Sequence, residues 1–230
     1  MIALQGHKVT FNYPKSPLLF SEVDIQVGEG ECVVLTGSSG CGKSTLCQIL
    51  AGIIHRSIQG NLQGEVLLYG EKISNLTLAQ VVSQVGIVFQ DPDRQLFCST
   101  VEDELAFGPE NLCFPRGEIT KRIEQVLEAV GITSLRTAEI RTLSQGQKQL
   151  VALAATLTLK PRVLILDEVF SPLDRNSIRQ VKEVLVGLRT SGYAILIVDH
   201  NPAGLELADR IYKLGNGRIR EVRYDRHCTL

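Results

Sequence analysis

The stretch GSSGCGKST, Gly37 to Thr45, decides the fold. A glycine, four free positions and then Gly-Lys-Ser form the spacing of a loop that cradles nucleotide phosphates. The apolar run ECVVLT leads into the loop and STLCQILAGII follows with helical character, which is the strand, loop and helix context that the motif requires. Gly37, Gly40 and Gly42 free the backbone N–H groups to point inward together. The sequence therefore predicts a bound nucleotide; a chance glycine loop before a helix is the alternative.

The groups in this loop have separate predicted parts in holding ATP and Mg²⁺. Lys43 places a point charge against the β- and γ-phosphates, and the Ser44 hydroxyl can bind Mg²⁺. The helix that starts near Ser44 adds the positive end of its dipole. The residues predicted to bind ATP here are Gly37, Ser38, Ser39, Gly40, Cys41, Gly42, Lys43, Ser44 and Thr45.

VLILDE, Val163 to Glu168, is the expected second half of the site. A buried strand that ends in two carboxylates presents them at the edge of the sheet where α/β proteins bind ligands. Asp167 is expected to hold the magnesium through water, and Glu168 to orient or deprotonate the attacking water. A solvated turn or a helix cap would give the same pattern, but the phosphate loop favours the catalytic interpretation.

Short apolar runs alternate with longer helical patterns, which is typical of an α/β fold. VGIVF, VLILD and YAILIVD are predicted parallel strands, apolar throughout because both of their faces are covered. Residues 1–30 predict an antiparallel β-layer, and EVLLYGEKI and YKLGNGRIREV are assigned the same character. We predict one domain over residues 1–230, in which 1–97 and 159–230 form the nucleotide-binding core with its β-layer. Residues from about 98 to 158 form an inserted helical subdomain.

Composition narrows the classes of protein. The chain has 230 residues, 44% hydrophobic and 21% charged, which is typical of a soluble globular protein with a sizeable core. The formal net charge of −1 gives no field that recruits nucleic acid, so no nucleic-acid partner is expected. None of the six cysteines forms a C-x-x-C pair, which disfavours a zinc or thioredoxin-like site. We expect free thiols that pack as small hydrophobes in a reducing cytosolic compartment.

No segment of the sequence predicts a membrane anchor. Residues 1–11 lack a basic region followed by an apolar stretch, so no signal peptide is expected. The longest apolar runs fall short of the roughly 20 residues that a spanning helix needs. If the protein works at a membrane, we expect another chain to hold it there.

The predicted helical part contains RTLSQGQKQLVALA, in which Ser144 is a plausible helix N-cap. The pattern indicates either a simple capped helix or a second anion site, formed by exposed N–H groups and a serine hydroxyl. LSQGQKQ closely resembles the LSGGQ signature of ATP-binding cassette (ABC) ATPases. The residues that carry this resemblance are Leu143, Ser144, Gln145, Gly146 and Gln147.

Further elements occur in the order of the ABC family, and the resemblance covers essentially the whole chain. Tyr13 resembles the aromatic residue that stacks on adenine, whereas the competing Phe11 is expected in the core. Gln90 in VGIVFQ resembles the Q-loop glutamine, and VLILDE resembles the Walker B strand. SPLD, with Ser171 and Asp174, resembles the D-loop, and His200 in LIVDH resembles the switch histidine.

The resemblance implies roles for these residues. Glu168, His200 and Gln90 are the implied catalytic residues, and Ser44, Gln90 and Asp167 are the implied magnesium contacts. Without the family order, a glutamine after a strand would be ordinary surface and a lone histidine structural. In ABC proteins the signature of one protomer completes the nucleotide site of another. The implied partner is therefore a second cassette, identical or paralogous, and closure of the dimer is the mechanical output.

The run FQDPDRQLF followed by TVEDELAFGPENL strongly resembles the ATPases of energy-coupling factor importers, including the cobalt and nickel types. It implies a transmembrane scaffold protein, a separate substrate-binding membrane subunit, and uptake of a vitamin or a transition-metal ion. It also implies a peripheral place on the cytoplasmic face of the membrane, where the stretch after Gln90 receives helices of the scaffold. Asp91, Asp93 and Glu102 to Glu104 are candidates to pair with scaffold arginines; a solvated acidic face is the alternative.

Some positions depart from the usual ABC pattern, and two other functions remain open. The departures are Gln145 for glycine, Leu150 for arginine, Val169 and Phe170 for Pro-Thr, and Asp199 for threonine. They leave open a non-identical partner cassette with two unequal sites. One alternative function is an ABC ATPase that acts on DNA or ribosomes, although no coiled-coil insertion, tandem cassette or basic patch is visible. The other is a P-loop chaperone of metals or cofactors, which would not need the signature.

Overall fold

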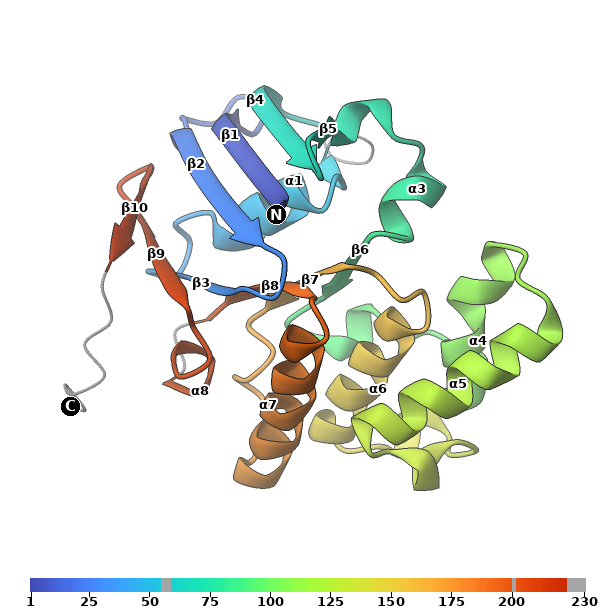
Figure 1. Cartoon of the computed structure of the whole chain (residues 1–230). Coiled ribbons are helices and arrows are strands. Elements are labelled where there is room, and N and C mark those ends of the chain that lie inside the picture. The colour runs from blue at the N-terminus through green and yellow to red at the C-terminus, as the bar shows by residue number, and fades with distance from the viewer. Residues whose placement is uncertain (55–58, 200–201, 223–230) are drawn as a thin grey trace.

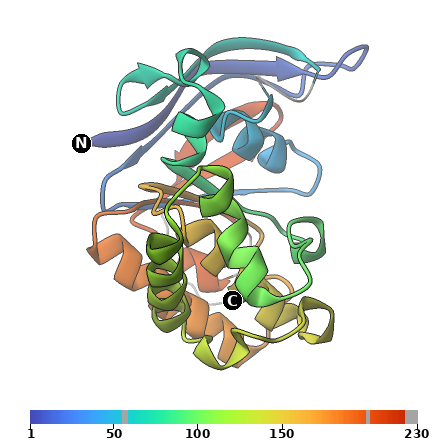
Figure 2. The ribbon, with the colours of Figure 1, turned by 90° about the vertical axis from the view of Figure 1, so that its right-hand side faces the viewer.

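The computed structural model describes residues 1–54, 59–199 and 202–222. Figure 1 shows a small β-layer above a larger sheet, with most of the helices below that sheet. The same order of layers is visible after the 90° turn of Figure 2. The predicted α/β fold, with an antiparallel β-layer, a mixed core sheet and a helical part, is confirmed.

The β-layer is a four-stranded antiparallel sheet in the order β2-β1-β4-β5. Its strands are β1 (Ile2–Asn12), β2 (Phe20–Gly28), β4 (Asn61–Leu68) and β5 (Glu71–Lys72). The alternation of buried and exposed residues along β2 places one of its faces against the core. The prediction that EVLLYGEKI belongs to this layer is confirmed, because its residues form β4 and β5.

The larger sheet has six strands in the order β10-β9-β3-β8-β7-β6. They are β3 (Cys32–Gly37), β6 (Val85–Val88), β7 (Val163–Asp167), β8 (Ala194–Val198), β9 (Arg210–Gly215) and β10 (Arg218–Val222). All pairs are parallel except β10 with β9. The assignment of YKLGNGRIREV to the β-layer is therefore wrong. This hairpin turns at Asn216 and Gly217 as expected, but β9 pairs with β3 and extends the core sheet.

The strands of the core sheet contribute side chains to two hydrophobic cores. On β3, Val33 and Leu35 pack in the core beneath the β-layer, whereas Val34 packs in the core on the helical side. On β7, Ile165 belongs to the first core and Leu164 to the second. Because successive strand residues point to opposite faces, a strand covered on both faces is apolar throughout. β7 and β8 are buried at every position, which confirms the prediction for these runs.

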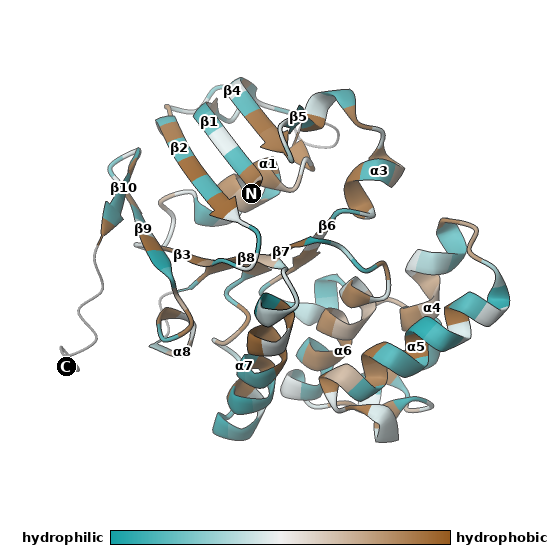
Figure 3. Cartoon of the chain, in the orientation of Figure 1, coloured by the Kyte–Doolittle hydropathy of each residue, from teal (hydrophilic) through white to brown (hydrophobic). Residues whose placement is uncertain are grey.

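The helices cover both faces of the core sheet. Helix α1 (Lys43–Leu50) lies between the two sheets, and α3 (Leu78–Val82) precedes β6. Helices α4 (Val101–Asn111), α5 (Arg116–Val130) and α6 (Gln145–Leu157) pack together on the other side, with α7 (Arg175–Thr190) beside them and α8 (Pro202–Leu205) before β9. In Figure 3 the outward faces of α5 and α7 are hydrophilic. Helices α4 to α6 fall in the range 98–158, and their identity as a separate subdomain stays a prediction.

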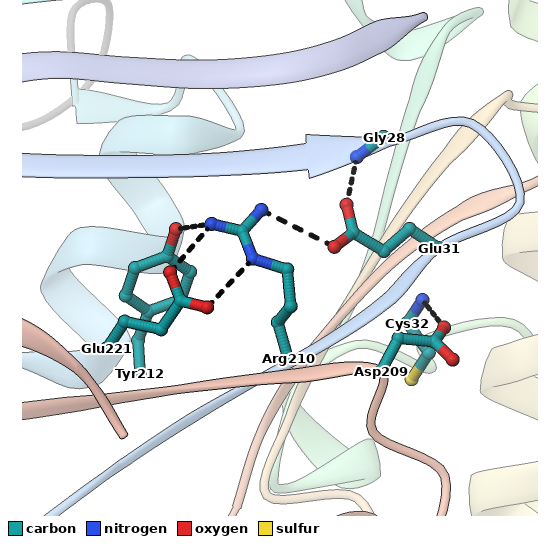
Figure 4. A network of polar contacts seen from close by, with 7 residues as sticks. All are labelled: Gly28, Glu31, Cys32, Asp209, Arg210, Tyr212 and Glu221. Atoms are coloured by element: carbon teal, nitrogen blue, oxygen red, sulfur yellow. Dashed lines mark hydrogen bonds and ion pairs between the residues drawn. The ribbon is translucent and has the colours of Figure 1, made fainter. Parts of the chain in front are cut away.

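A polar network ties the core sheet to the β-layer beside β3 (Figure 4). The Arg210 guanidinium contacts both carboxylate oxygens of Glu221 at 3.2 and 3.0 Å and Glu31 Oε1 at 3.4 Å, and it donates to the Tyr212 hydroxyl. Glu31 Oε2 accepts the backbone N–H of Gly28, the last residue of β2, at 2.6 Å. The hairpin of β9 and β10 is therefore attached to the turn that leads from the β-layer into β3.

Within the described residues, none of the helices is long and apolar enough to span a membrane. The five cysteines of this part of the chain are free thiols, and Cys32 and Cys47 are buried as predicted. Burial raises the pKa of Cys32 to about 12, so this thiol stays protonated at neutral pH.

Candidate functional site

The phosphate loop lies between β3 and α1, where the sequence places it. Gly37 pairs with Leu214 of β9, and an added Cβ would lie 2.4 Å from the Leu214 carbonyl oxygen. Gly42 has a φ of +103° and precedes the first residue of α1. Glycine is required at the first position by close approach and at the second by backbone conformation. The N-terminus of α1 then faces the loop, as an anion site requires.

Lys43 is buried and spans the loop from inside. Its Nζ donates to the carbonyl oxygens of Gly37 at 3.0 Å and Ser38 at 3.1 Å. The same Nζ lies 3.8 Å from Glu168 Oε1. An ammonium group held among oxygens at the mouth of a helix N-terminus is placed to meet phosphate oxygens.

The two carboxylates at the end of β7 differ in environment. Asp167 is buried, and burial raises its pKa, whereas a hydrogen bond with Ser44 lowers it. Its Oδ1 has no hydrogen-bond partner among the described residues. Glu168 has a φ of +49°, and its backbone N–H donates to the Val198 carbonyl at 2.7 Å. A non-glycine residue in this region stores strain, which is common at functional sites.

The residues present fit a magnesium ion. A buried carboxylate oxygen without a partner and an adjacent serine hydroxyl are hard oxygen ligands of the kind that Mg²⁺ prefers. Over the described ranges, His, Cys, Asp and Glu side chains form no group of three that could hold a metal alone. An ion bound by Ser44 and Asp167 would therefore complete its shell with water and phosphate oxygens, as Mg²⁺ usually does.

A cleft of about 900 Å³ opens beside these groups. Its lining includes Ser44, Asp167, Gln90, Gln145 and Ser171. The structure therefore brings the phosphate loop, the end of β7, the Gln90 segment and the start of SPLD to one cavity. A cleft of this size is typical of small-molecule sites.

Tyr13 lies against the phosphate loop, and Phe11 does not. The Tyr13 hydroxyl is 2.9 Å from Thr45 Oγ1, and its ring is half-buried. Phe11 is fully buried beneath the β-layer, as predicted, and packs edge-on to Tyr13 at 4.9 Å between ring centroids. The Tyr13 side chain therefore lies beside Thr45, the last residue of the loop, and its stacking on adenine stays a prediction.

The predicted N-cap Ser144 is confirmed at the start of α6. Ser144 Oγ accepts the Gln147 N–H at 3.3 Å, and Gln147 Oε1 accepts the Ser144 N–H at 2.9 Å. Leu143 is buried beside this cap. A Cβ on Gly146 would lie 2.7 Å from Ser177 Oγ, so this glycine also allows α6 and α7 to pack closely. The last residue of SPLD, Asp174, caps α7 by accepting the Ser177 N–H at 2.8 Å.

Two sequence predictions end differently. His200 lies outside the described residues, so its proposed contact with phosphate stays a prediction. Among the acidic residues after Gln90 that were candidates to pair with scaffold arginines, Glu104 is excluded by its burial, whereas the assignment of the others stays a prediction. Glu104 is buried and accepts the N–H groups of Phe97 and Cys98 at 3.0 and 2.9 Å. Glu102 pairs with Arg136 at 2.7 Å, and Asp91 with Arg94 at 3.3 Å.

Sequence reasoning missed the side chains that join the Gln90 segment to α6. Asp93 Oδ1 lies 2.5 Å from Lys148 Nζ, and Gln149 donates to the Phe89 carbonyl at 3.2 Å. The spacing of QGQKQ, which puts Gln145, Lys148 and Gln149 on one helix face, was the available signal.

This geometry defines a P-loop ATPase with an ABC-type signature, and comparison with known proteins supports the same class. The sequence pattern of the family described as "ABC transporter" matches residues 20–171. The chain belongs to this family, whose ATPase members hydrolyse ATP to power transport.

Individual relatives carry more specific names. The chain is 40% identical over 220 residues to the "Energy-coupling factor transporter ATP-binding protein EcfA" of Methanosarcina acetivorans, across 95% of this chain and 78% of that protein. It is 41% identical over 200 residues to the "Putative HMP/thiamine import ATP-binding protein YkoD" of Bacillus subtilis, across 86% of this chain and 37% of that one. The chain thus spans about a third of the length of several curated relatives that it matches.

A solved structure gives the same answer for the fold. The cbiO1 protein of Clostridium perfringens, described as part of the ABC transporter complex cbiONQ, superposes with a TM-score of 0.84 at 31% identity. The match covers 95% of this chain and 87% of that one. The sequence resemblance to the ATPases of energy-coupling factor importers is therefore confirmed.

Proposed function

We propose that this chain is the ATP-hydrolysing subunit of an energy-coupling factor importer. The observation that carries the proposal is the arrangement of Lys43, Glu168, Asp167 and Ser44 around one phosphate loop. Lys43 neutralises phosphate charge, Ser44 and Asp167 hold magnesium, and Glu168 takes the proton of the attacking water. Magnesium, when bound by Ser44 and Asp167, would offset the negative charge that develops on the phosphates during phosphoryl transfer. Gln90, in the lining of the cleft, would contact the magnesium or the attacking water, and the family resemblance assigns the γ-phosphate to His200.

Replacement of the base tests this assignment. Glu168→Gln keeps the size of the side chain and its reach but removes the proton acceptor. Loss of general-base catalysis lowers turnover by about 10² to 10⁴-fold. We expect the variant to retain MgATP binding and to accumulate as a closed dimer, measured by light scattering. Turnover equal to the wild type would show that Glu168 is not the base.

The proposed active species is a dimer of cassettes. Membership of the ABC family supports a dimer. The first turn of α6, which Ser144 caps, is exposed at Gln145 and is therefore accessible to a neighbouring chain. The signature Leu143 to Gln147 and the loop Ser171 to Asp174 would act on the nucleotide of the neighbouring chain. The variant Ser144→Ala, in which Lys43 is unchanged, tests the dimer. We expect ATP binding to persist and turnover to fall, because one hydrogen-bond donor to the nucleotide phosphate of the neighbouring chain is lost.

In the proposed importer, the energy of ATP hydrolysis drives uptake through separate membrane subunits. The proposed partners are a transmembrane scaffold protein and a substrate-binding membrane subunit, and the proposed cargo is a vitamin or a transition-metal ion. The relatives named for HMP/thiamine import and for an energy-coupling factor transporter support an importer and a vitamin. The chain would then act at the cytoplasmic face of the membrane as a peripheral subunit. The comparisons do not favour the alternative of an ABC ATPase that acts on DNA or ribosomes.

An exposed aromatic pair offers the contact with the scaffold. Phe97 is 65% exposed and Phe107 is 43% exposed, and their rings meet edge to face at 4.5 Å between centroids. The buried carboxylate of Glu104 fixes the backbone of Phe97. Two exposed apolar rings that pack on each other, one on the loop before α4 and one on α4 itself, support an interaction site. The proposed occupant is a helix of the scaffold with an apolar face.

Co-purification tests this contact. Phe97→Ser should abolish recovery of the membrane subunits from detergent extracts, while the ATPase rate of the isolated chain stays within about twofold of wild type. Leu78, which is 61% exposed on α3, gives the control Leu78→Ser, which should leave recovery intact. Equal recovery with both variants would exclude the aromatic pair as the docking surface.

A further inference from the structure

The hairpin of β9 and β10 has two faces that differ in charge. One face carries Arg210 and Glu221, whose ion pair belongs to the network in Figure 4. The other face carries Lys213, Arg218 and Arg220. Lys213 lies directly opposite Arg220 in the register of the hairpin, and Arg218 is two positions before Arg220. Since opposite residues and alternate residues of paired strands share a face, the hairpin gathers these three cationic side chains on one side.

The three cationic side chains have no carboxylate partner. Lys213, Arg218 and Arg220 are all exposed, and none of them forms an ion pair or a side-chain hydrogen bond in the described part of the chain. Like charges directly opposite each other on paired strands lower the stability of a sheet. An anionic ligand on this face would offset that repulsion.

These side chains line a cleft of about 590 Å³ that reaches the phosphate loop. The lining also includes Ser38 of the loop and Asn216 at the turn of the hairpin. Lys213 pairs with Thr36 of β3, two positions before Ser38, so the cations begin one strand away from the loop. A cleft with three cations, a serine hydroxyl and an amide suits a small anion that has several oxygens.

Ser38 lies at the γ-phosphate end of the predicted nucleotide site. Its carbonyl accepts Lys43 Nζ at 3.1 Å, and Lys43 is the group assigned to the β- and γ-phosphates. The other end of the loop is Thr45, whose hydroxyl meets that of Tyr13, the residue assigned to adenine. The cleft with the three cations therefore adjoins the place where the terminal phosphate of ATP would lie.

We propose that this cleft is a product site, which receives the orthophosphate released by hydrolysis before it reaches solvent. The inference rests on the proposed ATPase function. Hydrolysis breaks the bond between the β- and γ-phosphates and leaves ADP and an orthophosphate anion, while Glu168 takes the proton of the water. Exposed cations attract this anion, but water and salt screen them. The site therefore draws orthophosphate away from Lys43 without retaining it.

Orthophosphate titrations of the full-length chain, followed by calorimetry, test the site. The triple variant Lys213→Gln, Arg218→Gln and Arg220→Gln removes the cations and leaves the buried face of the hairpin unchanged. We expect it to lose at least about tenfold in affinity for orthophosphate, because the charge-assisted hydrogen bonds are gone. Lys43→Ala, which removes the cation of the phosphate loop, should retain orthophosphate affinity within about threefold, since the cleft remains.

Product inhibition gives a second measurement. Orthophosphate added to the wild type should inhibit ATP hydrolysis by filling the exit, and the triple variant should need at least about tenfold more orthophosphate for the same inhibition. The matched control is the triple variant Lys72→Gln, Lys121→Gln and Arg179→Gln, which removes as many exposed cations from β5, α5 and α7. Its orthophosphate affinity and its inhibition by orthophosphate should equal those of the wild type.

Several outcomes would overturn the product site. Equal orthophosphate affinities of the two triple variants would show that the hairpin does not hold the anion. Weaker binding by the hairpin variant with unchanged product inhibition would indicate an adventitious ion only. Binding of phosphatidylglycerol vesicles through the hairpin, with no response to orthophosphate, would assign the cations to a membrane surface instead. If the wild type hydrolyses no ATP, the proposed function fails, whereas the titrations still decide whether the cleft binds orthophosphate.

Discussion

Gly37→Ala probes how closely the phosphate loop packs on β9. An added Cβ would lie 2.4 Å from the Leu214 carbonyl oxygen and 2.8 Å from Cys41 Sγ. Ordinary contact begins at 3.4 Å, so the loop and β9 must separate by about 1 Å. A displacement of about 1 Å at reacting groups costs on the order of 100-fold in rate. Overpacking also costs about 1–3 kcal/mol of stability.

ATPase turnover at saturating MgATP and thermal unfolding measure the two effects. Gly40→Ala is the matched control in the same loop. No atom lies within 4 Å of its added Cβ, and only the φ of +77° resists the change. Its expected cost is about 1 kcal/mol of stability, with turnover well above that of Gly37→Ala. Equal turnover in the two variants would refute the argument from close packing.

Three further changes have expected outcomes. Tyr13→Ala should weaken ATP binding about tenfold through loss of the stacking face, whereas Tyr13→Phe, which loses only the bond to Thr45, should weaken it less than threefold; equal affinities in titrations would exclude stacking. Phe11→Ala should lower the free energy of unfolding by about 3–5 kcal/mol in urea, and a cost below about 1 kcal/mol would contradict its place in the core. Arg210 lowers the pKa of Glu221 from its ordinary value of 4.5. The ion pair therefore stabilises the fold above pH 4.5, and this contribution is lost as the pH falls further. The Tm difference between wild type and Glu221→Gln should be largest at neutral pH and vanish in acid, whereas a difference independent of pH would exclude a stabilising role of the pair.

Local sequence patterns predicted the parts of the site that local geometry builds. The phosphate loop needs glycines, a preceding strand and a following helix, and all of these are contiguous in the chain. The cap at Ser144 needs only Gln147, three residues away. The carboxylates that end β7 were assigned to the site because the strand occurs together with the phosphate loop; the strand pattern by itself also fits a solvated turn.

Contacts between segments that are far apart in the chain could not be predicted from the sequence. Asp93 and Lys148 are 55 positions apart, so the acidic run after Gln90 was interpreted as a surface for partners. Glu104 resembles an exposed helical carboxylate in sequence, but it folds back onto the N–H groups of its own preceding loop. The hairpin of β9 and β10 shows the same limit: its turn was visible in the Asn-Gly pair, whereas its sheet depended on pairing with β3.

The sharing of β3 and β7 between two hydrophobic cores has a consequence for how the molecule melts. Val33 and Val34 are neighbours on one backbone, yet each is sealed by a different layer. Loss of either layer would expose one face of β3 and β7 to water, and the remaining layer packs on the other face of the same strands. We therefore expect calorimetry to record a single unfolding transition. Large-to-small substitutions in either hydrophobic core should lower the temperature of that one transition.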